Sequence, residues 1–243
     1  TCIDRIDGEY TDKRRFLIFD YCGNFEYFRA HKEGFESKET KTLSENIFGK
    51  QVRLISLLQE NDYAEEDYRN WRKVLSDTCL QQIRALNTEL TAVKLKLRYV
   101  EKYKKESAFA LLSEGDKGEL LQHIAPLIQV DDADELAKRF DNFMYGMMLA
   151  WAEHTPAFKY AKKQLCSIAS ALEQKVSIPQ IKEKLDVIQS INSDDFWNAN
   201  DILLFEKIRE KLRELIKFLD SDAGKEPIIT RLTDPIILQQ DGE

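Results

Sequence analysis

Large apolar side chains repeat at helical spacing from about Leu43 onward. A first helix is predicted around one apolar face, formed by Ile47, Leu54, Ile55 and Leu58. A second is predicted from Glu65 to about Leu90, on Tyr68, Trp71, Leu75, Ile83 and Leu86. The pattern continues over 91–112, where a break is expected, and a short helix that starts at 113–116 is expected to end near Pro126.

A clear helical stripe follows in the middle of the chain. Asp132 and Glu135 have the spacing of a capping box, which predicts a helix start. Apolar residues follow at helical spacing: Leu136, Phe140, Phe143, Met144, Met147 and Trp151. The methionines, including Met148, indicate core packing or, less often, an adaptable partner surface. Thr155 and Pro156 then predict an N-cap and a first-turn proline for a helix through about Gln174, and a shorter helix opens at 177–179.

The last helix is predicted to begin after a cap at Ser193–Asp195 and to end at Ala223-Gly224. Its apolar side carries Ile202, Phe205, Ile208, Leu212, Leu215 and Leu219. Its other side is expected to hold pairs at i, i+3 that each contribute only about 0.2–0.5 kcal/mol. They are Glu206–Arg209, Glu210–Arg213 and Glu214–Lys217.

Two short segments depart from the helical pattern and are strand-like, Phe16–Asp20 and Pro227–Thr233. A single strand needs neighbours for its backbone N–H and C=O groups, so the two are expected to pair with each other or with a second copy of the chain. Glycine and proline number only 9 and 5, too few for an all-β fold. The sequence therefore predicts a mainly α protein, a multi-helix bundle with a short N-terminal and a short C-terminal strand.

Composition restricts the classes of function. The 243 residues are 43% hydrophobic and 33% charged, which is typical of soluble, folded proteins. The net charge of −7 argues against a strongly basic surface that wraps nucleic acid, although a local patch is compatible with it. No apolar run approaches the ~20 residues that cross a bilayer, and no signal peptide follows Thr1. We therefore expect a cytoplasmic location and, since the sequence does not start with Met, a piece of a longer protein.

Motifs for catalysis are missing from the sequence, which has no GxxxxGK[ST], GxSxG or GxGxxG. Glu-x-Lys occurs at 36–38, 39–41 and 173–175, but in a predicted loop or helix rather than on the adjacent strands of a metal-dependent nuclease. The cysteines lack CxxC spacing, which favours reduced thiols; they are Cys2, Cys22, Cys79 and Cys166. The histidines form no metal-binding pattern; they are His31, His123 and His154. We expect no catalytic, cofactor-binding or metal-binding residue here.

One basic stripe is a candidate contact surface. Lys94, Arg98, Lys102 and Lys105 lie at i, i+4, i+8 and i+11, along one predicted helical face. Such a stripe is suited to a nucleic-acid backbone or an acidic partner. The alternative, a solvated charged face without a partner, is the commoner case and is favoured.

The segment FLIFDYCGNFEYF at 16–28 resembles the stretch after the last helicase motif in the motor (R) subunit of type I restriction endonucleases. The likeness continues through RYVEKYKKESAFALLS (98–113), AKRFDNFMYGMMLA (137–150), IPQIKEKL (178–185), FWNANDILLFEKIREKLRELIKFL (196–219) and IITRLTDPI (228–236). It covers nearly the whole chain, in segments typical of packing and assembly rather than catalysis. At Arg231 and Leu232 the family more often has an aromatic residue and an acid.

The resemblance implies three parts. Residues 1–30 would be the last strand and exit loop of a second RecA-like helicase domain, and the rest of its sheet would lie upstream. Residues 31–225 would form a helical domain, and residues 226–243 would form a short strand and a loose tail. The whole protein would cleave unmethylated DNA after ATP-driven translocation, with ATP and Mg bound upstream. This region would serve assembly with the methyltransferase and specificity subunits and would meet DNA through that complex.

Two alternatives of other classes stay open from the sequence. One is a stand-alone helical scaffold or adaptor without a link to restriction. The other is an accessory domain of another helicase that touches DNA directly.

Overall fold

The computed structural model describes residues 41–129, 134–199 and 201–219. All of them lie in the second of the two units into which the chain divides, Thr1–Thr40 and Lys41–Glu243. Within these ranges every regular element is a helix and no strand occurs, so the mainly α class is confirmed for the described part of the chain. The strand-like segments at 16–20 and 227–233 lie outside the described residues and stay predictions, as do the boundaries at 30/31 and 225/226.

The α-helices are α2 Leu43–Leu57, α3 Glu66–Arg84, α4 Thr91–Leu95, α5 Leu97–Tyr103, α6 Glu114–Glu119, α7 Glu135–Ala152, α8 Ala157–Glu173, α9 Pro179–Glu183, α10 Leu185–Ser190, α11 Asp194–Asn198 and α12 Ile202–Leu212. Short 3₁₀ segments are η1 Asn61–Tyr63, η2 Glu106–Phe109, η4 Ala125–Leu127 and η5 Arg213–Phe218, and η3 Leu120–Ile124 is a π-helical turn. Among the described helices, none combines the length and the apolar character needed to cross a membrane.

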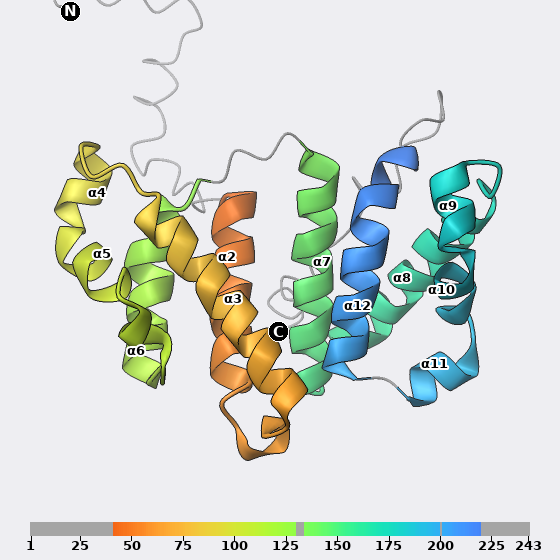
Figure 1. Cartoon of the computed structure of the whole chain (residues 1–243), viewed down its shortest axis with the longest axis horizontal. Helices are drawn as coiled ribbons and strands as arrows, with labels where there is room; N and C mark the ends of the chain where they lie inside the picture. The colour runs from red at the N-terminus through yellow and green to blue at the C-terminus, as the bar shows by residue number, and fades with distance from the viewer. Residues whose placement is uncertain (1–40, 130–133, 200, 220–243) are drawn as a thin grey trace, which may run out of the picture. The chain divides into compact units, whose positions relative to one another are not determined.

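Helix α7 is the centre of the helical unit. It packs most extensively on α2 and also contacts α8, α12 and η5, and Figure 1 shows it between α2 and α12. The predicted stripe is confirmed at Phe140, Phe143, Met144 and Met147, but the other sides of the helix are buried too, through Tyr145, Met148 and Leu149. All three methionines have no exposed surface, which confirms the core-packing interpretation.

The region after α3 is less regular than predicted. Helix α3 ends at Arg84 rather than near Leu90, because the side chain of Asn87 accepts a hydrogen bond from the Glu89 N–H and forms a turn in place of a further helical turn. The expected break within 91–112 is confirmed: it lies at Lys96, which separates α4 from α5.

Three helix starts differ from the predicted ones. The cap of α7 is Asp134, whose carboxylate accepts from the Ala137 N–H at 3.0 Å, so the predicted start at Asp132 is wrong by two residues. At α8, Pro156 occupies the capping position, while the Thr155 hydroxyl turns back toward the Ala150 carbonyl. Ser193 does cap a helix, but this is the short α11 and not the last helix, which begins at Ile202.

The apolar side of the last helix is confirmed, although α12 gives way to the 3₁₀ segment η5 at Arg213. Its predicted apolar positions from Ile202 to Leu219 are all buried. Phe205 is the middle of an aromatic cluster drawn from α7, α8 and α11. The ring centroids around it lie at 6.0 Å for Trp151, 6.0 Å for Phe158, 6.4 Å for Phe196 and 6.3 Å for Trp197.

Helix α7 ends with His154 in the left-handed region, at φ 54°. The His154 N–H donates to the Trp151 carbonyl at 3.1 Å and the Thr155 N–H to the Ala150 carbonyl at 3.0 Å, which is the hydrogen-bond pattern of a Schellman motif. Glycine is the usual residue at this position because it has no Cβ to clash.

Replacement of His154 by glycine is expected to stabilise the protein by about 0.5–1 kcal/mol, since it removes the left-handed strain. Chemical denaturation followed by circular dichroism measures the change. His154→Ala, which keeps the Cβ, is the control and should give no gain. An equal gain from both substitutions would mean that the imidazole itself, not the backbone, is unfavourable there.

Candidate functional site

The four residues of the predicted basic stripe do not share one continuous helical face. The break at Lys96 leaves Lys94 on α4 and places Arg98 and Lys102 on α5. Lys105 follows the end of α5 and precedes η2. The prediction of one continuous stripe is therefore wrong, because Lys96 departs from helical geometry at φ −112°, ψ 13°.

Lys102 belongs to a cluster that joins α5 to α6. Its Nζ lies 2.8 Å from Asp116 and 2.8 Å from Glu119. The Tyr103 hydroxyl lies 2.8 Å from an oxygen of each of these carboxylates. Hydrogen bonds from Lys102 and then Ser113 hold the pKa of Asp116 well below its usual range, and hydrogen bonds to Asp116 and Glu119 raise the pKa of Lys102. Lys102 therefore fixes α6 on α5 and is not a free cation.

The other three cations differ in their surroundings. Lys94 pairs with Glu89 at 2.9 Å. The Arg98 guanidinium lies 4.4 Å from the centre of the Tyr99 ring, and that ring stacks on His123 at 4.0 Å. Lys105 forms no ion pair with a described residue. Arg98, Lys102 and Lys105 nevertheless line one shallow depression of about 490 Å³ together with Glu101, Ser107 and Ala108.

The Lys102 cluster gives the stability of the protein a defined pH dependence. Because the folded-state pKa of Asp116 is depressed, its carboxylate contributes stability above the unfolded pKa of about 3.9, and this contribution is lost as the pH falls through the folded pKa. Lys102→Gln is therefore expected to have a lower free energy of unfolding than the parent at pH 6, and this difference should be smaller at about pH 2. Denaturant melts of parent and variant at several pH values measure this difference in the free energy of unfolding. Lys94→Gln is the control. A difference between parent and Lys102→Gln that stayed constant with pH would contradict the coupling of Lys102 to Asp116.

A second charged cluster, which is not among the predicted site residues, lies between α7, α12 and η5. Arg209 donates to Asp141 at 2.7 Å and makes a two-fold contact with Glu206 at 2.7 Å and 2.7 Å. Arg213 donates to the other oxygen of Asp141 at 2.8 Å. The side chains of Asp141, Glu206 and Arg209 are only 11%, 9% and 14% exposed. The predicted weak pair Glu206–Arg209 is thus a buried pair, and Arg213 bonds across to α7.

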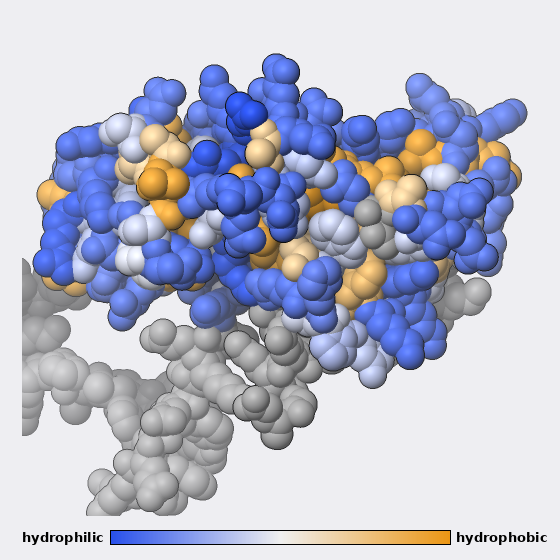
Figure 2. Space-filling model, turned by 90° about the horizontal axis from the view of Figure 1, so that it is seen from below, coloured by the Kyte–Doolittle hydropathy of each residue, from blue (hydrophilic) through white to orange (hydrophobic). Residues whose placement is uncertain are grey.

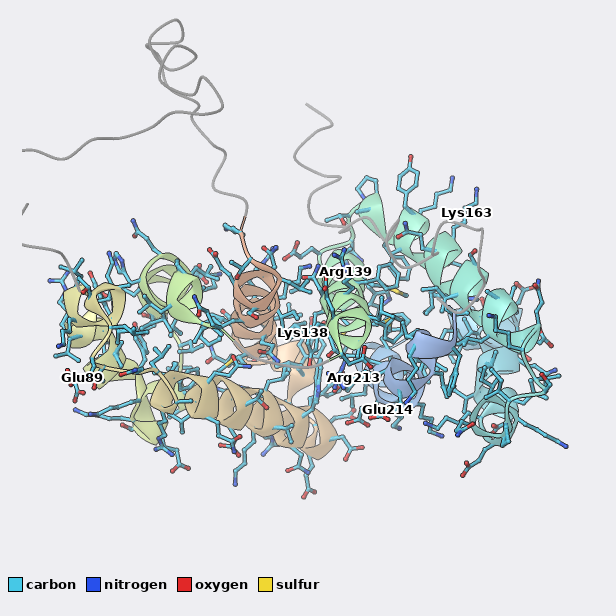
Figure 3. The ribbon with its side chains drawn as sticks, turned by 90° about the horizontal axis from the view of Figure 1, so that it is seen from above. Glu89, Lys138, Arg139, Lys163, Arg213 and Glu214 are labelled. Carbon is cyan, nitrogen blue, oxygen red and sulfur yellow. The ribbon has the colours of Figure 1, made fainter. Side chains whose placement is uncertain are left out.

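The neighbours of Arg209 in this cluster favour its charged form. Although burial opposes the charge of Arg209, the hydrogen bond to Glu206 and the nearby Tyr145 raise its pKa. The guanidinium lies 5.0 Å from the centre of the Tyr145 ring, and burial raises the pKa of that phenol. A cavity of about 270 Å³ adjoins the cluster between α2, α3, α7 and α12. Two of the residues that line it are labelled in Figure 3: Lys138 lies on the α2 side of α7, and Arg213 lies beside α7 and α12.

The contacts of both clusters hold helices together. Each carboxylate of the buried cluster is already bonded to an arginine, which leaves it unsuited to take a proton from a substrate. Within residues 41–129, 134–199 and 201–219, no group of three or more histidine, cysteine or acidic side chains could hold a metal ion. Burial raises the pKa of the Cys79 and Cys166 thiols, which disfavours the reactive thiolate at either residue.

The surface of the α4–α5 region exposes leucines beside the cations. Leu90, Leu95 and Leu97 are 55%, 78% and 40% exposed. Figure 2 shows that the face it presents is mostly hydrophilic, with separate hydrophobic patches among the polar side chains. Leu95 follows Lys94 and Leu97 precedes Arg98, so exposed apolar and charged side chains alternate in this region.

Comparison of the chain with protein-family models, with curated proteins and with solved structures finds no match.

Proposed function

We propose that the chain is the C-terminal helical domain of the R subunit of a type I restriction enzyme. In this proposal it assembles the motor with the methyltransferase and specificity subunits in the cytoplasm. ATP and Mg bind to upstream domains of the same subunit, which translocate and cleave DNA. The segments at 16–20 and 227–233 are short strands, the first of them the last strand of a RecA-like domain. The assignment to this family rests on the sequence segments quoted above.

The exposed leucines of the α4–α5 region are the structural observation that supports docking as the role of the helical unit. Exposed apolar side chains that gather in one region are typical of protein contact surfaces. Arg98, which follows Leu97 directly on α5, adds positive charge beside this leucine, which favours an acidic partner surface and faster association. The stand-alone adaptor is the second candidate, because the same surface would serve any acidic protein partner.

Direct DNA contact is less well supported. Two of the four predicted cations, Lys94 and Lys102, are already paired with carboxylates. Each phosphate contact by these residues would require an existing ion pair to be broken, and the chain carries a net charge of −7.

The test is a binding assay of this chain with the methyltransferase–specificity core of the same system, beside a duplex DNA shift assay. We expect Leu95→Glu/Leu97→Glu to weaken binding to the core at least about tenfold, since it places charge in the apolar contact. Tyr160→Glu, an exposed position on α8, is the control and should bind normally. Tight duplex binding without binding to the core would favour the DNA-contacting accessory domain instead, and binding to neither would leave the adaptor as the better candidate.

A further inference from the structure

A cavity of about 500 Å³ lies beside α3 and η2, separate from the buried cluster. Its lining consists of Arg69, Arg72, Lys73, Ser76, Asp77, Leu80, Glu106, Ser107, Phe109 and Ala110. The volume is in the range of cavities that hold small organic ligands. Leu80 and Phe109 give it an apolar part, and the remaining side chains are mostly charged.

Arg72 is the unusual member of the lining. Its Nη2 donates to Gln59 at 2.9 Å and to the carbonyls of Phe109 at 3.2 Å and Ala110 at 2.7 Å. Its Nε is buried and has no hydrogen-bond partner in the described part of the chain. No carboxylate of a described residue pairs with this guanidinium, and burial lowers its pKa. The residue as a whole is only partly buried, so its guanidinium can line the cavity as a cation that no described carboxylate neutralises, and a negatively charged ligand there is favoured.

The neighbouring charges restrict the chemistry of that acceptor. Arg69 and Lys73, on the same side of α3, also lack an ion-pair partner among the described residues, so three cations meet at the cavity. Asp77 and Glu106 line it as well, and neither carboxylate is paired with a described cation. Two fixed negative charges disfavour a phosphate with its higher charge, whereas a single carboxylate is accommodated.

We propose that this cavity binds a carboxylate carried on an apolar frame, either a free organic acid or the acidic side chain of a peptide. The carboxylate meets the Arg72 guanidinium where it lines the cavity, with Lys73 and Arg69 adding attraction, and the hydrocarbon part packs on Leu80 and Phe109. This inference concerns α3 and η2 alone and holds whether or not the α4–α5 region docks on a restriction complex.

Calorimetric titration of the whole chain with benzoate tests the proposal. We expect saturable binding with a dissociation constant of about 1 mM, and binding of acetate at least about tenfold weaker because it lacks the apolar part. Arg72 also anchors η2, so the variants avoid it. Lys73→Gln should weaken benzoate binding about two- to fivefold and Asp77→Asn should strengthen it by a similar factor. Lys94→Gln, on α4, should leave it unchanged.

A second arm identifies the source of the carboxylate. The peptide acetyl-Leu-Glu-Leu-amide is compared with its Gln counterpart and with benzoate: tighter binding of the Glu peptide indicates a peptide ligand, and tighter binding of benzoate a free acid. The proposal is wrong if benzoate and the Glu peptide both fail to bind up to about 50 mM. It is also wrong if phosphate binds as tightly as benzoate, or if Lys73→Gln and Asp77→Asn leave benzoate affinity unchanged while their melts match the parent.

Discussion

Replacement of Asp141 by alanine is expected to lower the free energy of unfolding by about 3–5 kcal/mol. The carboxylate is 11% exposed and receives hydrogen bonds from both Arg209 and Arg213. Its removal leaves Arg209 with Glu206 as its remaining carboxylate, and leaves Arg213 without its contact on α7. A buried guanidinium without sufficient acceptors is costly because water cannot reach it.

Urea denaturation of the purified chain measures this change. Arg139→Ala is the matched control on the same helix, because its pair with Glu135 is exposed, at 42% and 69%, and should contribute less than about 0.5 kcal/mol. Figure 3 shows Arg139 on α7. Equal effects of the two substitutions would show that the buried cluster contributes no more than a surface pair.

Phe205→Ala is expected to destabilise the protein by a similar amount, about 3–5 kcal/mol. The ring has no exposed surface and is surrounded by four aromatic side chains from α7, α8 and α11. Truncation would lose both the transfer free energy of the ring and its edge contacts with Trp151, and the rigid neighbours would close the resulting cavity only in part.

The same denaturation assay measures the Phe205 change, with Tyr160→Ala as the aromatic control. Tyr160 lies on α8 and is 61% exposed, so its truncation should change stability by less than about 0.5 kcal/mol. A loss below about 1 kcal/mol for Phe205→Ala would mean that α12 packs on the other helices more loosely than described.

The sequence predicted those features of the fold that depend on one helix at a time. The buried side of α12 was predictable because its apolar residues recur at i, i+3 and i+4 spacing, a local property. The burial of α7 on its remaining sides was not, since Tyr145 and Leu149 become buried only through neighbours that are distant in sequence. The helix ends were shifted by one to several residues because competing side-chain bonds, such as the one from Asn87, decide them.

The candidate site was predicted less well, because its contacts also depend on residues that are distant in sequence. Spacing alone placed Lys94 and Lys102 on one face, but it could not show that Lys96 leaves the helix or that Asp116 and Glu119 would meet Lys102. The sequence does carry one signal for the buried cluster: Asp141 is an acid that shares a helical face with Ala137, Met144 and Tyr145. A charge at such a position predicts a buried partner, although only the fold identifies the arginines of α12 and η5 as that partner.

The central position of α7 has a consequence for the order of folding. Its main neighbours, α2 and α12, lie far before and far after it in the sequence, with α3 to α6 and α8 to α11 between them. Contacts between such distant segments require the intervening chain to be closed into a loop, which slows folding. During synthesis α7 emerges with α2 already available but with α12 still to come. Its α12 side, including Asp141, then stays open to solvent until the last described helix has left the ribosome.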